Sequence, residues 1–396
     1  MTQIYNKAIH KTISINRVLG HIKGVHKGAT IVFFAGIHGN ETAGVFALQE
    51  VLDTIKPETV SGTIYGISGN LKALKENQRY LDKDLNRLWT QKQLEALKLK
   101  ETLNTEEQEQ IELFKLIERI ISSNSGPFYF IDFHTTSSKT LPFITINDAL
   151  INRKFSKLFP VPIVLGIEEY LNGPLLSFIN ELGYVSLGFE SGQHDEKEAI
   201  ENCISFIYLA LRNVTVIEQK HIPQCQVLYQ QLQINANHLS DIFEVVYLYH
   251  IKRDEVFKMN SGFKSFQDIV KGTILATSNQ QMVKSTYNAR LFMPLYQSKG
   301  EEGFFIIKPI KPFFLKLSAG LRHLKFDSLL VLFPGISWDN KNKNVLKVNL
   351  NIAKFFAKSI FHLLGYRNKK INETHLLLYN REHSSKIEAY KNELWY

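Results

Sequence analysis

The sequence is poor in several features that mark secreted and membrane proteins. Its 396 residues include only 2 cysteines, Cys203 and Cys225, too few for a disulfide framework or a thiolate metal site. No apolar run approaches the roughly 20 residues that cross a bilayer. The amino-terminal segment also lacks the apolar core and the small-residue cleavage site of a secretory signal. We therefore expect a cytoplasmic protein in a reducing compartment, with no membrane partner.

A concentrated basic segment is also missing, although the net charge is +9. The lysines are spread along the chain, and no zinc-finger or single-strand-binding motif is present, which argues against a nucleic-acid partner. Hydrophobic residues make up 44% and charged residues 21%, a balance typical of a folded globular protein. We interpret the positive charge as a solvated basic surface that could help draw an anionic metabolite towards a cleft.

The chain is long enough for more than one domain, and its first half alternates between apolar strands and amphipathic helices. The predicted strands are residues 30–35, 62–67, 128–133, 142–146 and 184–189, and the predicted helices are residues 41–55, 111–121 and 196–212. Residues 91–110 are predicted to be an external helical insertion. Because several strands are apolar throughout, we expect an α/β fold with a mixed, largely parallel sheet and helices on both faces.

The pattern changes after about residue 220, where short alternating segments are separated by turns. We expect a catalytic domain of residues 1–215, a smaller β-rich domain of residues 216–311, and an α+β carboxyl-terminal extension of residues 312–396. Within the extension we expect a strand at residues 328–333, a polar loop at 338–344 and a helix at 349–364.

Three side chains with catalytic potential follow the predicted strands. His38 comes after the strand at 30–35, His134 after that at 128–133, and Glu190 after that at 184–189. Ligands of open α/β sheets bind at the carboxyl edge of the strands, so these three side chains could converge on one cleft.

His38 and Glu41 are close enough in sequence to bind one metal ion, and Gly39 removes side-chain bulk between them. On its own, this pair would more often be an ordinary surface pair. With His134 it forms a set of two imidazoles and one carboxylate, which leaves a fourth tetrahedral position open, as a catalytic zinc requires. Asp132 is a candidate partner of the site, but we expect its side chain to point to the opposite face of its strand.

Two further segments allow both a structural and a catalytic interpretation. Glu190 is either a cap of the helix that begins near Asp195 or a buried general base. The polar segment 78–88 contains Arg79, Asn86 and Arg87, and is either a salt-bridged surface loop or a source of oxyanion and carboxylate contacts.

The residues singled out above lie in four motifs, which are, in chain order, GIHGNETAG at 36–44, RYLDKDLNR at 79–87, DFHTTS at 132–137 and FESG at 189–192. Together they resemble the succinylglutamate desuccinylase/aspartoacylase family, a branch of the zinc carboxypeptidase superfamily that is related to M14-like metallopeptidases. The resemblance covers about residues 28–215 well and extends more loosely to about 310, whereas the carboxyl-terminal extension has no match.

This resemblance implies one zinc ion per chain, with His38, Glu41 and His134 as ligands and Glu190 as the general base. It also implies a zinc carboxypeptidase-like fold.

The resemblance further implies that Arg79 polarises the scissile carbonyl and that Asn86 and Arg87 hold a substrate carboxylate. One departure concerns the basic residue that best-known members carry shortly before the catalytic glutamate. Residues 171–189 contain neither Arg nor Lys. This counts against aspartate-type and succinyl-type substrates and favours a neutral or hydrophobic side chain on the amine.

The first hypothesis is therefore a zinc amidohydrolase, a deacylase that removes an N-acyl group from an amino acid or a related small amine with a carboxylate. The second is a metallocarboxypeptidase that acts on short peptides, with Arg87 taking the terminal carboxylate. The third is a metal-bound binding or scaffolding protein without turnover, whose extension makes protein contacts. The sequence leaves the acyl group, the amine and a homo-oligomeric state open.

Overall fold

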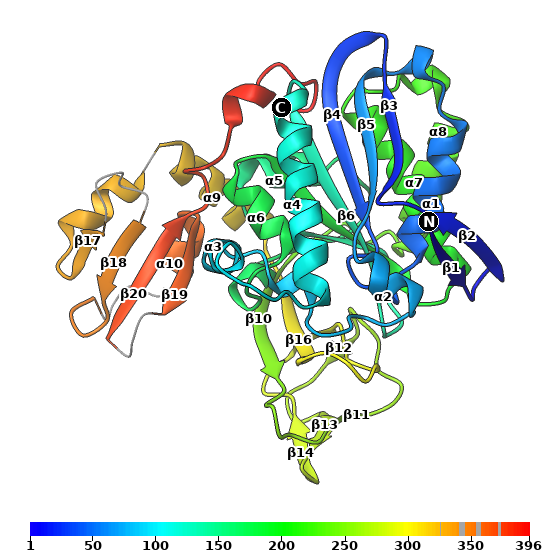
Figure 1. The fold of residues 1–396 in the computed structure, drawn as a ribbon. Coiled ribbons are helices and arrows are strands. Elements are labelled where there is room, and N and C mark those ends of the chain that lie inside the picture. The colour runs from blue at the N-terminus through cyan, green and yellow to red at the C-terminus, as the bar shows by residue number, and fades with distance from the viewer. Residues whose placement is uncertain (325, 340–344, 354–357, 371–373) are drawn as a thin grey trace.

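The computed structural model describes residues 1–324, 326–339, 345–353, 358–370 and 374–396 (Figure 1). The largest sheet contains β3 (Val18–Lys23), β4 (His26–Ala35), β5 (Ser61–Ser68), β6 (Phe128–Thr136), β7 (Phe143–Ile146), β8 (Ile163–Leu165), β9 (Val185–Gln193), β10 (Ile242–His250), β12 (Asp268–Ile269), β15 (Ala289–Phe292) and β16 (Glu302–Pro309). Within the described residues these eleven strands follow the order β12-β15-β16-β10-β8-β7-β9-β6-β4-β5-β3.

The strands that carry the candidate site are parallel neighbours. β5, β4, β6 and β9 pair in parallel, whereas β7 pairs antiparallel with β9. Their carboxyl ends therefore meet at one edge of the sheet, as predicted for His38, His134 and Glu190. The mixed sheet confirms the predicted fold class.

The helices are α1 (Ala43–Thr54), α2 (Leu71–Lys75), α3 (Gln91–Leu97), α4 (Thr105–Ser123), α5 (Leu150–Ser156), α6 (Leu175–Glu181), α7 (Lys197–Asn213), α8 (Cys225–Asn235), α9 (Pro312–His323) and α10 (Lys358–Leu363). The helices predicted at 41–55, 111–121 and 196–212 correspond to α1, α4 and α7. The predicted insertion at 91–110 contains α3 and the first turns of α4.

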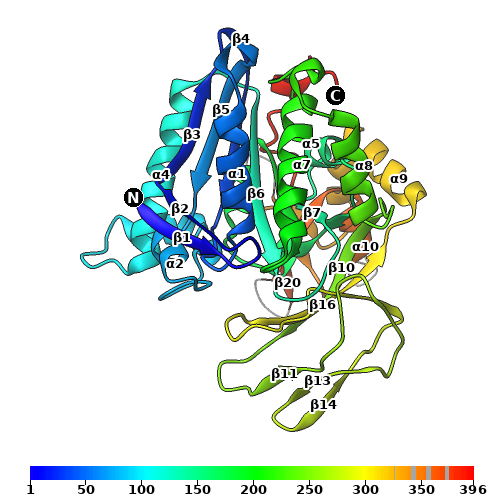
Figure 2. The ribbon, with the colours of Figure 1, turned by 90° about the vertical axis from the view of Figure 1, so that its right-hand side faces the viewer.

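Apolar side chains of the central strands alternate between two cores, one on each face of the sheet. In β4, Ile31 and Phe33 belong to the core shared with α1, α5, α7 and α8, whereas Val32 and Phe34 belong to the core shared with α4 and α6. Figure 2 shows α4 on one side of the sheet and α7 and α8 on the other. Helices cover both faces, which explains why residues 31–35 of this strand are all apolar.

The β-rich segment shares the large sheet with the first half of the chain. β10 pairs in parallel with β8, and β16 pairs antiparallel with β10. A separate small sheet of β11 (Phe257–Met259), β13 (Ile274–Ser278) and β14 (Gln281–Lys284) projects below (Figure 1). One sheet thus crosses the predicted boundary at 215–216, and the division into domains stays a prediction.

The extension contains a sheet of β17 (Ile336–Trp338), β18 (Val345–Asn349), β19 (Tyr366–Lys370) and β20 (His375–Asn380). The strand predicted at 328–333 is wrong, because Phe326–Leu332 forms a 3-10 helix. A short apolar run does not distinguish a strand from a buried helical segment. Residues 340–344 of the predicted loop, and 354–357 of the helix predicted at 349–364, lie outside the described residues; α10 forms the last part of that range.

The last residues of the extension return to the main core. Tyr390 is buried, and its hydroxyl accepts a hydrogen bond of 2.9 Å from the backbone N–H of Val185 in β9. The indole N–H of Trp395 donates to the hydroxyl of Tyr129 in β6 at 3.0 Å. The amino-terminal strands β1 (Thr2–Asn6) and β2 (Lys11–Ile15) form a hairpin beside the sheet. Among the described residues, no helix has both the length and the apolar character needed to span a membrane.

Candidate metal centre and cleft

His38 and Glu41 lie in the tight turn between β4 and α1, and both side chains are buried. The turn packs closely against the segment after β5. A Cβ atom at Gly39 would lie 2.1 Å from the backbone carbonyl carbon of Ala73. Only glycine fits at this position, so the absence of a side chain there allows the approach that places the two candidate ligands.

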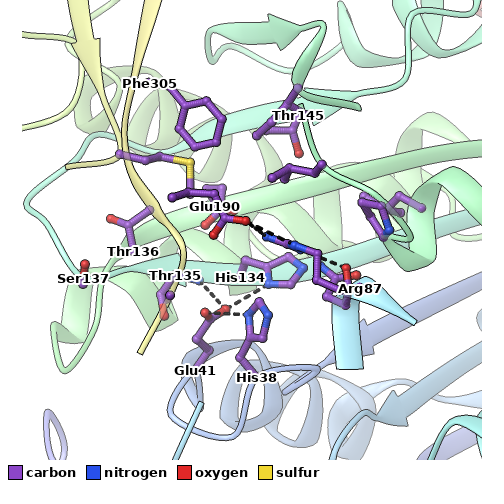
Figure 3. A pocket seen from close by; sticks show the side chains of 18 of the residues that line it. His38, Glu41, Arg87, His134, Thr135, Thr136, Ser137, Thr145, Glu190 and Phe305 are labelled. Carbon is purple, nitrogen blue, oxygen red and sulfur yellow. Dashed lines mark hydrogen bonds and ion pairs between the residues drawn. The ribbon is translucent and has the colours of Figure 1, made fainter. Parts of the chain in front are cut away.

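The structure brings His38, Glu41 and His134 together (Figure 3). The Nδ1 atom of His38 lies 2.8 Å from Oε1 of Glu41, and the Nδ1 atom of His134 lies 2.9 Å from Oε2 of the same carboxylate. One candidate ligand atom from each of these residues lies within 4.8 Å of the others. This arrangement could hold one metal ion.

The outer nitrogen of each imidazole also faces a carboxylate. Nε2 of His38 lies 3.1 Å from Asp84, and Nε2 of His134 lies 2.8 Å from Asp132. A neutral imidazole donates through one nitrogen only, so each ring needs an additional proton or a cation on its Glu41 side. Carboxylates on the outer nitrogens are the usual partners of histidines that bind metals, and the residues therefore fit a zinc ion.

The expected orientation of Asp132 was wrong. Its side chain lies on the same side of β6 as His134, because residues two positions apart in a strand face the same way. Asp84 was part of the RYLDKDLNR motif but received no role from the sequence. Its spacing of five residues from Arg79 gave no indication that it would reach His38.

Electrostatics within the cluster favour a positive charge between the carboxylates. Burial would raise the pKa of Glu41, but the adjacent His38 and the hydrogen bond from His134 outweigh it and hold this pKa well below its ordinary value. Burial would lower the pKa of His134, but Asp132 and Glu41 raise it well above the usual range. For both residues the neighbouring opposite charge, and not burial, decides the direction in which the pKa shifts.

Glu190 lies in β9, in register with His134 of β6, and its side chain is buried. Its Oε2 atom accepts no hydrogen bond from any described residue. Burial raises the pKa of Glu190 to about 8, so this carboxyl can hold a proton near neutral pH. Helix α7 begins at Lys197, and the residue before it is Glu196, so the alternative role of Glu190 as its cap is not supported.

Arg79 contacts one of the candidate metal ligands, Glu41, directly. Its guanidinium donates to Glu41 at 3.3 Å and to Asp84 at 3.1 Å. Its Nε atom is buried and donates to no described residue. Arg79 therefore joins the segment 79–87 to the metal cluster and retains one N–H group for another acceptor.

Arg87 and Asn86 line the same cleft but already have protein partners. Arg87 forms an ion pair of 2.7 Å with Glu302 of β16, and the side-chain oxygen of Asn86 accepts from the backbone N–H of Leu175 at 2.9 Å. The sequence did not indicate Glu302, because it lies 215 residues from Arg87.

The cleft has a volume of about 120 Å³ and is built from distant segments. His38, Glu41, His134 and Glu190 lie at the metal end (Figure 3). The loop between β15 and β16 contributes Met293, Pro294, Leu295, Gln297 and Gly300, which the sequence analysis missed. The β-rich segment thus covers part of the candidate site.

Known proteins resemble this chain in sequence and in fold. Residues 27–212 match the family described as succinylglutamate desuccinylase/aspartoacylase catalytic domain. The succinylglutamate desuccinylase of Photorhabdus laumondii is 33% identical over 112 residues, which cover 27% of this chain and 33% of that protein. The probable aspartoacylase of Acaryochloris marina is 29% identical over 127 residues, which cover 31% of this chain and 40% of that protein. The matches thus span about a third to two fifths of the length of these curated relatives.

Solved structures show the same fold over a larger share of the chain. A succinylglutamate desuccinylase/aspartoacylase from Rhodobacter sphaeroides has a TM-score of 0.56 at 14% identity and covers 78% of this chain and 94% of its own. The succinylglutamate desuccinylase from Vibrio cholerae has a TM-score of 0.55 at 16% identity and covers 72% of this chain and 83% of its own. At these identities the likeness concerns the fold alone.

Proposed function

We propose that this protein is a zinc-dependent amidohydrolase, because residues 27–212 match the succinylglutamate desuccinylase/aspartoacylase catalytic domain family. It removes an N-acyl group from an amino acid or a related small amine that carries a carboxylate. The observation that carries the proposal is the pairing of a candidate metal cluster with the buried carboxylate of Glu190 in one cleft.

His38, Glu41 and His134 would hold one zinc ion per chain, with Asp84 and Asp132 fixing the two imidazoles from behind. Zinc bound by two imidazoles and a carboxylate supplies Lewis-acid activation of a water molecule and of a carbonyl oxygen.

Glu190 acts as the general base. Its unpaired oxygen accepts a proton from the attacking water, and the carboxyl then returns a proton to the nitrogen of the leaving amine. The raised pKa of Glu190 supports this role, because a proton shuttle must both accept and release a proton near neutral pH.

Arg79 and Arg87 have different roles. The free N–H of Arg79, beside Glu41, donates to the carbonyl oxygen as its negative charge develops. Arg87, together with Asn86, binds the carboxylate of the amine portion through charge-assisted hydrogen bonds, in exchange for part of its pairing with Glu302.

The cover over the cleft favours small substrates. The loop that contains Met293 and Gln297 lines the same cavity as the metal cluster, whereas a peptidase of the same centre needs an open cleft. The metallocarboxypeptidase hypothesis is therefore the second candidate. A binding protein without turnover would need neither Glu190 nor the free N–H of Arg79.

The test is a screen of the zinc-loaded protein against N-acetyl and N-succinyl amino acids and dipeptides, with release of free amine as the measurement. We expect hydrolysis of N-acyl amino acids by the unaltered protein, and hydrolysis that is slower by about 10²–10⁴-fold in Glu190→Gln. Cleavage of dipeptides alone would favour the carboxypeptidase, and the absence of any hydrolysis would overturn the proposal.

A further inference from the structure

Glu168 is a second buried carboxylate in the cleft, and the proposed mechanism does not use it. It lies in the 3-10 turn Ile167–Glu169, is 1% exposed, and lines the same cavity as the metal cluster. One of its oxygens, Oε1, lies 3.0 Å from the guanidinium of Arg381. The other oxygen, Oε2, is buried and accepts no hydrogen bond from any described residue.

An unpaired carboxylate oxygen at such depth is costly, because it has lost water without gaining a donor. Arg381 does not fully compensate it. The same guanidinium also contacts Glu169 at 2.7 Å and Asp148 at 3.5 Å. Asp148 has Arg153 and Arg322 as further partners and Glu169 has His362, whereas Arg381 is the cation that the described residues place against Glu168. A donor from a ligand in the cleft would complete the hydrogen bonding of Glu168.

Part of the wall of this cavity is apolar, beside the polar side chains of Thr145, Asn147 and Ser177. Ile146, Ile167, Leu171 and Leu176 line the cavity, and residues 171–189 supply no Arg or Lys. These apolar residues could contact the aliphatic stem of a substrate side chain, while the buried carboxylate of Glu168 could pair with a positive charge at the end of that stem. Lysine-like side chains combine these two properties.

We propose that Glu168 recognises a cationic nitrogen at the end of the substrate's amine-side chain. The preferred substrates are then N-acyl amino acids with a cationic side chain on an aliphatic stem, such as Nα-acetyl-L-lysine. The inference rests on the proposed function in taking this cleft as the substrate site. It replaces the neutral or hydrophobic side chain that the sequence favoured, because the sequence did not place Glu168 in the cleft.

The test compares ligands that differ only at the end of the side chain. Isothermal titration calorimetry on zinc-loaded Glu190→Gln measures the binding of Nα-acetyl-L-lysine, Nα-acetyl-L-norleucine and Nα-acetyl-L-glutamate without turnover. Because hydrogen bonds to charged groups contribute about 1.5–3 kcal/mol, we expect the lysine derivative to bind roughly 10- to 100-fold more tightly than the norleucine derivative. The glutamate derivative should bind most weakly.

The variant that tests the residue is Glu168→Gln in the same background, and its matched control is Glu169→Gln. Both carboxylates contact Arg381, but only Glu168 lines the catalytic cavity. We expect Glu168→Gln to lose the preference for lysine over norleucine and Glu169→Gln to keep it. Equal loss in both variants would overturn the inference.

The calorimetric comparison of the three ligands leaves Glu168 unchanged. It therefore tests whether the cleft prefers a cationic side chain even if Glu168→Gln fails to fold. Equal affinity for the lysine and norleucine derivatives, or no binding of either, would overturn the inference. A preference for lysine in calorimetry, with no hydrolysis of any N-acyl amino acid by the unaltered protein, would support the inference and overturn the proposed function.

Discussion

Asp84 and Asp132 hold the two candidate zinc-binding histidines in place. Each carboxylate accepts from the outer nitrogen of one imidazole, which turns the Nδ1 atoms of His38 and His134 towards Glu41. Such partners fix the tautomer and raise the basicity of the ligand. We therefore expect Asp84 and Asp132 to influence the metal affinity together with the three candidate ligands.

Asp132→Asn should lower zinc affinity about 10- to 100-fold, because asparagine keeps the shape but removes the charge behind His134. Competition with a chromophoric chelator measures the affinity. Asp268→Asn is the control, since Asp268 is exposed on a surface strand and pairs with Arg290. Unchanged affinity in Asp132→Asn would remove Asp132 from the site.

Glu190→Gln should keep zinc but lose hydrolysis by about 10²–10⁴-fold, because glutamine matches the shape and cannot accept the proton. Elemental analysis and kcat measure the two properties. Loss of zinc would make Glu190 a ligand, and undiminished turnover would exclude it from the mechanism.

Arg79→Ala should mainly lower kcat, because the hydrogen bond from Arg79 to the carbonyl oxygen is strongest in the transition state. Arg87→Ala should mainly raise KM, because Arg87 contacts the carboxylate of the bound substrate. Steady-state kinetics on one N-acyl amino acid separates the two effects. Zinc content must be measured in parallel, since Arg79 also contacts Glu41. A higher KM in Arg79→Ala together with a lower kcat in Arg87→Ala would show that the two arginines have the opposite roles.

At the scale of elements, the turn between β4 and α1 sets the position of two of the three candidate ligands. Gly39 has no room for a side chain, since the segment around Ala73 packs directly against it. The backbone N–H of Gly39 also donates to the carbonyl of Arg79 at 3.1 Å. This turn therefore joins the His38 segment to the arginine segment.

Gly39→Ala should lower the thermal unfolding temperature and zinc content together, because the added methyl group must displace the backbone near Ala73. Gly320→Ala is the control. Gly320 lies within α9 with nothing within 4 Å of the added Cβ, and an alanine there should stabilise the helix by about 1 kcal/mol. Normal zinc content in Gly39→Ala would show that the turn tolerates a shift.

At the scale of the whole molecule, buried ion pairs join the extension to the catalytic core. Arg322 of α9 donates to Asp148 at 2.7 Å, and Arg381, which follows β20, contacts Asp148 and Glu168. Arg322 has a side-chain exposure of only 1%. The extension, which lies outside the family match, thus contacts Glu168, the residue that we propose to select the substrate.

The ion pairs of Asp148 should make stability depend on pH. Burial would raise the pKa of Asp148, but Arg153 and Arg322 outweigh it and hold this pKa far below its ordinary value. The folded state therefore binds fewer protons than the unfolded state. The stabilisation is fully present above the unfolded pKa of about 4 and is lost as the pH falls below it.

Asp148→Asn should destabilise the protein by about 3–5 kcal/mol near neutral pH, because buried guanidinium groups lose their partner. Thermal unfolding from pH 3 to pH 7 measures the difference from the unaltered protein. We expect this difference to narrow below about pH 4, where Asp148 begins to accept a proton in the unfolded state. A difference that stays constant over this range would contradict the linkage.

The sequence by itself determined the α/β architecture and the main candidates for the site. Largely apolar strands such as 30–35 and 128–133 indicated cover on both faces, and segments with helical periodicity followed them. His38, His134 and Glu190 could be placed in one cleft because parallel strands share a carboxyl edge. These inferences depend on local period and chain order, which a sequence displays directly.

Only the tertiary structure decided the contacts between segments that are distant in sequence. Glu302 meets Arg87 and Glu168 meets Arg381 across more than 200 residues, and Tyr390 enters the core beneath β9. No sequence periodicity or residue spacing predicts these contacts, because they result from the packing of whole helices and strands against one another. The candidate metal ligands were therefore accessible from the sequence, whereas the carboxylates and arginines that surround them and shape the cleft emerged only from the fold.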